Sequence, residues 1–316
     1  MFSSELWNKP ASGGTPAELT TRGIFAFGTN GNTGSATKFN VSNLVSSSGV
    51  VASDTTGVGT TRADTHGATY SDDKGIYFGG SGADTVTNLI SNNGVVASDT
   101  SMVGRNFQGG GGMRFGQTKA LFAFGYDTDA ENLYNISRIV GDNGVVGSEV
   151  SGVGTARYAM GGGGGVAYGD DRGIIAFGHT GAQAQGISNL VSNSGVVASD
   201  TAAVGAARWS FASSTYGDDK AVYALGRYGS GGESQISNLV SNTGVIASDT
   251  STVAKARRGP GGCGYGEDKG IISFGAVGTS GSGGVTNLIS NSGVIASDVS
   301  QVGSDLKGKG ACGFAN

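Results

Sequence analysis

Short apolar runs recur along the chain, each preceded by a charged or polar turn and closed by glycine. The clearest run covers residues 271–274, follows Asp268-Lys269-Gly270 and ends at Gly275. Five close copies precede it, and the six closing glycines are Gly28, Gly79, Gly125, Gly178, Gly226 and Gly275. These glycines are spaced by 46 to 53 residues, a period that is typical of the blades of a β-propeller.

Each repeat predicts four short antiparallel strands. In the last full repeat, a glycine-rich stretch at 261–265 precedes the run 271–274, and stretches 285–290 and 294–298 follow it. The second stretch is apolar at successive positions, as expected for a sheet that is packed on both faces. The first stretch is the richest in glycine, which places it beside a shared axis where side chains have no room. The fold class is therefore expected to be all-β.

The two ends of the chain complement each other. Residues 1–20 match no part of the repeat and are expected to form an extended N-terminal arm, after which residue 21 begins with second-strand sequence. The C-terminal residues 308–316 align with 259–267, so they supply the first strand that the N-terminal repeat lacks. We expect residues 21–316 to form a six-bladed β-propeller, with its ring closed by the C-terminal strand completing the N-terminal blade.

Composition narrows the classes of partner. The chain has 316 residues, 61 of them glycine, and a formal net charge of −4, which gives no reason to expect nucleic acid as a partner. Residues 1–10 lack the pattern of a signal peptide and no apolar run approaches a membrane span, so no membrane insertion is expected. Cys263 and Cys312 are too few for a disulfide scaffold and are expected to be buried free thiols.

Two resemblances follow from the wording of the repeat. A basic residue, a glycine pair and x-Lys-Gly-Ile-Ile-x-Phe-Gly resemble the kelch repeat over residues 21–316, which implies four-stranded propeller blades. The double glycine after the second strand occurs only at Gly79-Gly80, and the usual tryptophan of the outer strand is absent. The sequence motif at 189–201 and 238–250 is similar to motifs in propeller-like proteins of tailed bacteriophages, which are labelled tail or virion structural proteins.

The second resemblance implies a function. It indicates a non-enzymatic structural component of a virion, such as a tail, fibre or shell decoration, assembled in the host cytoplasm without a signal peptide. Its partners would be other virion proteins, and a homo-oligomer is expected. The N-terminal arm carries the candidate docking residues Leu6, Trp7 and Pro10, because a tryptophan outside the repeats can anchor a partner, although it can equally pack on the propeller rim.

The alternative function is a glycan-binding module that recognises a host surface. The loops after the second strands differ most among the repeats, above all at 127–134 and 227–233, and propellers place such loops on one face. Aromatic rings can stack on sugars, although packing against a neighbouring side chain is the simpler role. The candidate residues for a glycan or another partner are Tyr126, Tyr134, Arg227 and Tyr228.

Charged residues recur at fixed places in the repeat. A carboxylate ends each fourth strand, at Asp54, Asp99, Glu149, Asp200, Asp249 and Asp298. An arginine follows in most repeats, at Arg62, Arg105, Arg157, Arg208 and Arg257, whereas Asp305-Leu306-Lys307 breaks the pattern. Because groups spread around a ring do not make one catalytic site, we expect ion pairs between blades or capped turns.

No enzymatic constellation is recognisable. The histidines are His66 and His179, at non-equivalent positions of different repeats, whereas a catalytic zinc or copper site needs two or three converging imidazoles. The acidic turns, such as Asp170-Asp171, lack the alternating oxygen ligands of a calcium loop. The sequence therefore predicts no catalytic residue, no metal site and no cofactor.

Overall fold

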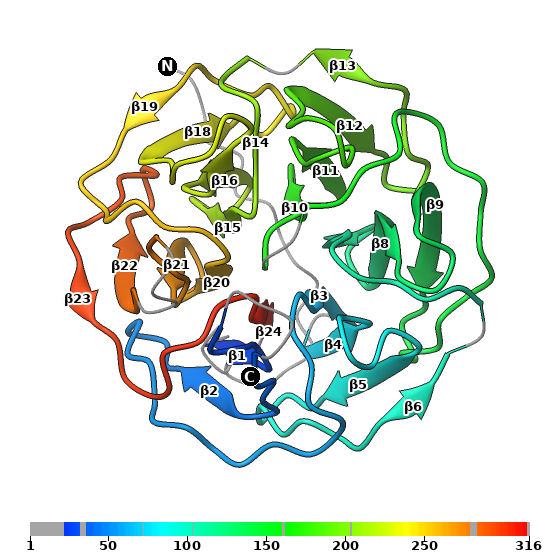
Figure 1. Ribbon diagram of the computed structural model, residues 1–316, viewed down its shortest axis with the longest axis horizontal. Helices are drawn as coiled ribbons and strands as arrows, with labels where there is room; N and C mark the ends of the chain where they lie inside the picture. Colours follow the sequence, from blue (N-terminus) through cyan, green and yellow to red (C-terminus); the bar gives the residue numbers. More distant parts are fainter. Residues whose placement is uncertain are drawn as a thin grey trace, which may run out of the picture.

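The computed structural model describes residues 22–31, 36–71, 73–102, 104–159, 162–202, 204–278 and 283–314. Six small antiparallel sheets stand around a central axis, so the chain forms a six-bladed β-propeller, as predicted (Figure 1). We number the blades 1 to 6 in the chain order of their second strands. Among the described residues, no helix has the length and hydropathy needed to span a membrane.

Each blade is built outward from the axis in the order of its strands, except that blade 1 takes its inner strand from the C-terminus. The inner strands of blades 1 to 6 are β24 (Gly310–Phe314), β3 (His66–Tyr70), β7 (Gly111–Phe115), β10 (Gly165–Tyr168), β15 (Ala212–Tyr216) and β20 (Gly261–Tyr265). The second strands are β1 (Arg22–Ala26), β4 (Lys74–Phe78), β8 (Lys119–Asp127), β11 (Arg172–Ala176), β16 (Lys220–Ala224) and β21 (Lys269–Ser273).

The outer half of each blade is shorter and more exposed. The third strands are β2 (Ser42–Val45), β5 (Val86–Ile90), β9 (Asn132–Val140), β12 (Ile187–Val191), β18 (Ile236–Val240) and β22 (Val285–Ile289). The fourth strands are β6 (Thr100–Ser101), β13 (Thr201–Ala202), β19 (Thr250–Ser251) and β23 (Val299–Ser300). They follow the stretch that was predicted for them: 294–298 contributes the single bridge Ile289–Ile295, and β23 begins after it. In blades 1 and 3, the fourth position is described by the single bridges Ser42–Thr55 and Ser137–Val150.

The ring closes in blade 1, as the sequence predicted. The C-terminal strand β24 pairs antiparallel with β1, so that Arg22 lies opposite Phe314 and Ala26 opposite Gly310. On its other edge β1 pairs with β2. Figure 1 shows the red β24 beside the blue β1 at the inner end of one blade. Both otherwise open edges are therefore used within a single sheet.

The second strands carry the apolar core, which lies between the blades. Successive residues of β1 enter different joins: Ile24 packs with Tyr77 of blade 2, whereas Phe25 packs with Phe274 of blade 6. All four side chains are fully buried. This two-sided packing explains why the run is apolar without alternation. Cys263 and Cys312 are buried free thiols, as predicted.

A closed ring of backbone hydrogen bonds surrounds the axis. One residue per blade donates its N–H to the carbonyl of the equivalent residue in the preceding blade, over N···O distances of 2.5 to 3.3 Å. We call this the axial hydrogen-bond ring, and its members are Asp64, Gly109, Ala159, Ser210, Gly259 and Gly308. It joins all six blades without using a side chain.

A second set of backbone bonds corrects the predicted register of blade 2. The closing glycine of each blade donates its N–H to the residue that enters the next blade, as Gly28 does to Arg62 at 2.8 Å. In blade 2 this donor is Gly80, at 2.9 Å from Phe107 O. Its φ of +117° matches the +112° of Gly28, whereas Gly79, at +56°, takes the place of Phe27, at +65°. The closing glycine is therefore Gly80 and not Gly79.

The axis is crossed by backbone ahead of β10. A Cβ placed on Gly162 would lie 2.5 Å from Lys309 O in blade 1 and 2.8 Å from Gly261 Cα in blade 6. Only glycine fits where three backbone segments approach one another so closely. Figure 1 shows the segment that leads into β10 reaching the centre of the ring. The described backbone therefore closes the axis at this level.

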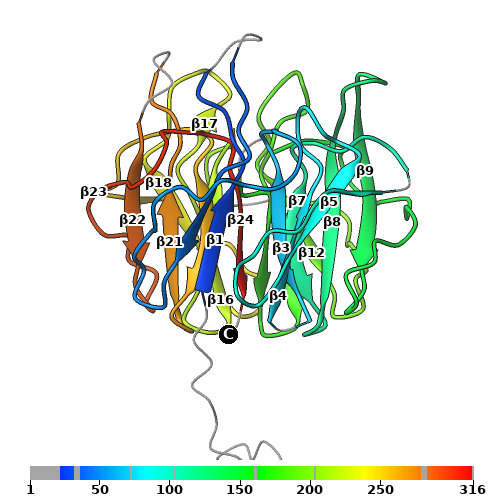
Figure 2. The same cartoon turned by 90° about the horizontal axis from the view of Figure 1, so that it is seen from below.

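The connections are divided between two faces. The links from second to third strands, and from each blade into the next inner strand, extend from the upper side in Figure 2. We call this the loop face. The tight turns between first and second strands lie on the opposite face, where they also bond to one another, as Gly116 N does to Asp171 O at 2.7 Å.

Candidate functional site

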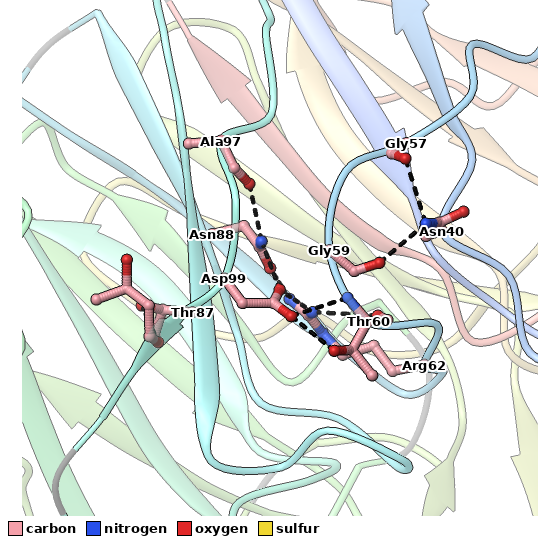
Figure 3. Close-up of polar contacts among 10 residues, drawn as sticks. Asn40, Gly57, Gly59, Thr60, Arg62, Thr87, Asn88, Ala97 and Asp99 are labelled. Atoms are coloured by element: carbon pink, nitrogen blue, oxygen red, sulfur yellow. Dashed lines mark hydrogen bonds and ion pairs between the residues drawn. The ribbon is translucent and has the colours of Figure 1, made fainter.

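A buried cation lies in the join between blades 1 and 2 (Figure 3). The guanidinium of Arg62 stacks on the Phe27 ring of blade 1, 3.8 Å from its centroid, and its side chain is fully buried. Arg62 donates a hydrogen bond to Asn88 Oδ1 and lies 3.6 Å from Asp99 Oδ1 of blade 2. Burial lowers the pKa of Arg62 to about 10, so it remains a cation at neutral pH. One side chain therefore links two blades.

Asp99 also holds the connection that carries the arginine. Its Oδ2 accepts hydrogen bonds from Thr60 N at 2.9 Å and Thr60 Oγ1 at 2.6 Å, and its Oδ1 accepts one from Asn88 Nδ2 at 2.8 Å. Partial burial raises the pKa of Asp99, but the hydrogen bonds from Thr60 and Asn88 and the charge of Arg62 outweigh it and hold the pKa below its usual value. Capping and ion pairing, which were expected as alternatives, occur together at this carboxylate.

The arrangement recurs at other joins. Arg157 stacks on Phe124 at 4.2 Å, donates to Asn189 Oδ1 at 2.6 Å and lies 3.8 Å from Asp200. Arg208 stacks on Phe177 at 4.1 Å. These groups hold blades together, which is the structural role that the sequence indicated.

Blade 3 keeps the predicted ion pair of Arg105 but carries this arginine at another position of the repeat. Its backbone N donates to Glu149 at 2.8 Å, as Thr60 N does to Asp99, so Arg105 aligns with Thr60 and not with Arg62. Its side chain is half exposed and stacks on Tyr134 at 4.5 Å. Arg105 Nε lies 3.4 Å from Glu149 Oε2, so the predicted ion pair is present. Only the expected equivalence with Arg62 is wrong, because Arg105 lies two residues before the arginine position of the repeat.

The buried cation and the aromatic ring come from other positions of the repeat at this join. Phe107 occupies the arginine position, with 1 % exposure, and Gly79 leaves the aromatic position without a side chain. The cation is instead Arg138 of β9, which is fully buried, contacts Glu149 and lies 5.6 Å from the Phe78 ring. The join keeps one buried cation and one partner ring although both come from different positions.

A pocket opens at the axis on the loop face. It has a volume of about 370 Å³ and is lined by residues of blades 1, 2, 5 and 6. Ser210, Gly259 and Gly308 of the axial hydrogen-bond ring line it. We call it the axial pocket. Its charged lining side chains, among the described residues, are Lys38, Asp64, Arg227, Arg258 and Lys307, and its aromatic side chain is Trp209.

Positive charge is concentrated in the axial pocket. Burial lowers the pKa of Lys307, and the neighbouring charges of Arg258 and Arg227 lower it further, while Asp64 acts in the opposite direction. Arg258 Nη1 lies 2.7 Å from Glu233 Oε1. Although Glu233 pairs with Arg258, the charges of Arg258 and Arg227 still oppose that of Lys307, in a protein whose formal net charge is −4. An anion in this pocket would relieve that repulsion.

An aromatic cluster continues from the pocket across blades 3 to 5. The ring of Trp209 lies 6.0 Å from Tyr158 and 5.2 Å from His179, and Tyr158 lies 6.1 Å from Tyr126. The guanidinium of Arg227 lies 5.7 Å from the Trp209 ring. Burial lowers the pKa of His179, whose Nδ1 accepts a hydrogen bond from Gly181 N at 2.9 Å, so this ring is neutral at pH 7. The cluster offers flat apolar surface beside the cations.

The structure brings together only part of the predicted site. Arg227 lines the axial pocket, Tyr126 belongs to the aromatic cluster, and Tyr228 lies next to Arg227 in β17 (Arg227–Tyr228). Tyr134 packs on Arg105 instead. The predicted loop 127–134 is shorter than expected, because β8 and β9 extend to Asp127 and Asn132. The docking candidates Leu6, Trp7 and Pro10, with the whole N-terminal arm 1–20, lie outside the described residues.

Sequence reasoning missed Tyr158, Trp209, Arg258 and Lys307. They share one place in the repeat, directly after the arginine position, where each blade forms a bridge to the residue after its closing glycine. This place is occupied in turn by Ala63, Gln108, Tyr158, Trp209, Arg258 and Lys307. The signal that could have revealed these residues is that this position differs from repeat to repeat, although it lies between two positions that are nearly constant.

Other polar clusters are sparse. No group of three or more His, Cys, Asp or Glu side chains within the described ranges is arranged to hold a metal ion. His66 is 1 % exposed and lies in blade 2, whereas His179 lies in blade 4. A second pocket of about 260 Å³ near the turn face is lined mostly by small residues, with Arg114, Asp170, Asp218 and Glu267.

The comparisons with known proteins supply no family. No protein-family model matches the chain, and no curated protein matches it at a significant level.

Proposed function

We propose that the protein is a glycan-binding propeller whose axial pocket binds a carboxylate-bearing saccharide. The observation that carries this proposal is that Arg227, Arg258, Lys307 and Trp209 line one pocket, in which the Arg227 guanidinium lies 5.7 Å from the indole ring. Guanidinium groups bind carboxylates through paired hydrogen bonds, and indole rings pack on the apolar faces of sugars. The pocket offers both within the size of one or two sugar rings.

The charge distribution favours an acidic sugar over a neutral one. The protein as a whole is acidic, whereas four of the five charged side chains described in the pocket lining are cationic. A neutral saccharide would leave their mutual repulsion in place. A carboxylate would offset it in a partly buried setting where electrostatic attraction is less screened than at the surface.

The experiment is a glycan array of acidic and neutral oligosaccharides, followed by calorimetric titration of the best acidic binder. Trp209→Ala and Arg227→Ala should each weaken binding by about tenfold or more, equivalent to roughly 1.4 kcal/mol. Tyr134→Ala is the matched control, because this ring stacks on Arg105 and does not line the pocket. Equal binding of acidic and neutral sugars, or an equal loss in the control, would contradict the proposal.

The resemblance to virion proteins carries a second proposal. We infer that the chain serves as a non-enzymatic component of a bacteriophage tail, fibre or shell decoration, docked through its N-terminal arm to other virion proteins. What supports this is the repeat wording at 189–201 and 238–250. Mass spectrometry of purified particles should detect the polypeptide and its copy number, and its absence from infectious particles would count against the role.

A further inference from the structure

The buried cation between blades 6 and 1 is a lysine, whereas the buried cations described between the other blades are arginines. Leu306 occupies the arginine position, and the cation is Lys309, which stands one residue before β24. Lys309 is fully buried, and its Nζ lies 4.0 Å from the centroid of the Phe274 ring of blade 6. The Nζ donates a hydrogen bond to Asn43 Oδ1 at 2.5 Å. The amine is therefore held against the side-chain amide of β2, away from solvent.

The amide is itself fixed from its other end. Asn43 is fully buried, and its Nδ2 donates to Asp54 Oδ1 at 2.8 Å and to Ala52 O at 3.0 Å. Asp54 in turn accepts hydrogen bonds from Ser304, and its charge acts on Lys309. An amine, an amide carbonyl and a carboxylate are thus arranged in sequence within one apolar join.

The same contact at other joins is chemically inert. Arg62 and Arg157 contact Asn88 and Asn189 in the equivalent way, but a guanidinium keeps its proton and is no nucleophile. A lysine can lose its proton when it is buried. Burial lowers the pKa of Lys309 to about 7, with the charge of Asp54 opposing the shift, so a substantial share of this amine is neutral at physiological pH.

We propose that Lys309 and Asn43 form an intramolecular isopeptide bond that closes the propeller ring covalently. The lone pair of the neutral Nζ attacks Asn43 Cγ and forms the new C–N bond. Asp54, which already accepts a hydrogen bond from Nδ2, passes the proton released by Nζ to that nitrogen. The bond between Cγ and Nδ2 then breaks and ammonia leaves. The products are one secondary amide and one ammonia, and no oxidant or other reactant is required.

The position of the bond gives it a mechanical consequence. Residues 43 and 309 flank β1 from its two edges, since β2 and β24 both pair with that strand. They are 266 residues apart in the chain. The bond would tie the end of the chain to its beginning, so that blade 1 could no longer open by release of β24. Blade 1 is the one blade that is assembled from both ends of the chain, so it is the blade that gains most from a bond.

The test is the intact mass of the purified full-length protein. The expected mass is one ammonia lower than the sequence requires, and a digest should contain a branched peptide that joins residues 43 and 309. Lys309→Arg, which restores the cation of the other joins, should return the mass to that of the sequence. Lys307→Arg is the control and should keep the branched peptide.

Two results would overturn the proposal. One is a wild-type protein with the full sequence mass and separate, unbranched peptides carrying residues 43 and 309. The other is an ammonia loss that fragmentation assigns to an asparagine followed by glycine, which can lose ammonia by cyclising on its own backbone. These are Asn30, Asn93 and Asn143. Because both are read from the wild-type protein, the proposal stays falsifiable even where a variant fails to fold.

Discussion

His66 should make the stability of the propeller depend on pH. It lies in β3 directly opposite Phe78, is 1 % exposed, and has no hydrogen-bond partner for either ring nitrogen among the described residues. A protonated imidazole in this place would lack both water and a counter-ion, so burial lowers its pKa to about 3. Only the neutral ring is compatible with the folded blade.

The magnitude follows from proton linkage. The unfolded chain binds a proton at His66 with a pKa of about 6.5, whereas the folded chain does so at about 3. The stabilising contribution is therefore fully present above about pH 6.5 and is lost as the pH falls through that window to about 3. At about 1.4 kcal/mol per pH unit, His66 lowers the free energy of unfolding by roughly 2 kcal/mol at about pH 5.

The assay compares urea unfolding of the wild type and His66→Leu at about pH 7.5 and about pH 5. Leucine fills much of the space and cannot take up a proton. The free energy of unfolding of the wild type should fall by roughly 2 kcal/mol more than that of the variant. His179→Leu, at a partly exposed ring, should keep most of the wild-type dependence. Parallel pH curves for the wild type and His66→Leu would refute a buried neutral imidazole.

Three further perturbations test the joins and the axial hydrogen-bond ring. Asp99→Ala removes the carboxylate beside Arg62 and should lower the free energy of unfolding by about 1–3 kcal/mol in urea titrations, with the loss shrinking at acid pH where Asp99 is protonated. Gly259→Ala forces a side chain onto φ +64° and should lower the melting temperature by an amount that corresponds to about 1–3 kcal/mol. Phe107→Arg should destabilise blade 3 by placing a second cation beside Arg138, and adding Arg138→Asn should recover part of the loss in a double-mutant cycle.

The substitutions at Asp99 and Gly259 each have a matched control. Asp129→Ala removes an exposed carboxylate and should change stability by less than about 0.5 kcal/mol. Gly186→Ala adds a Cβ at ordinary φ with its nearest neighbour 3.6 Å away, so it should be nearly neutral. Additive effects of the two blade 3 substitutions would contradict direct coupling between positions 107 and 138. A melting temperature unchanged by Gly259→Ala would contradict the strain assigned to its positive φ.

The fold could be predicted because the residue pattern of each repeat determines how its strands must pack. The uninterrupted apolar run of the second strand requires packing on both faces, and the glycine-rich first strand requires a crowded axis. Ring closure followed from the match between residues 308–316 and 259–267. The register of blade 2 could not be settled in this way, because two adjacent glycines look alike in a sequence. Only the backbone shows that Gly79 adopts the φ of a replaced phenylalanine.

The candidate site was harder to predict because no stretch of sequence contains it. Its members come from different blades, and each is a single residue between positions that repeat. Aligning the repeats directs attention to what they share, such as the recurring arginines, and these proved to be structural. Arg105 matched the pattern in residue type and in its carboxylate partner Glu149, but not in its position in the repeat.

The structure explains why the repeats differ from one another at positions around the axis. The residue after each arginine position is held by a backbone bridge, and the next residue by the axial hydrogen-bond ring. Neither restraint depends on the side chain, so alanine at position 63, tryptophan at 209 and lysine at 307 all suit the same backbone. Buried positions such as Arg62 have no such freedom, since any change there must be compensated, as it is in blade 3. The loop face at the axis is therefore where side chains can differ from blade to blade without loss of the fold.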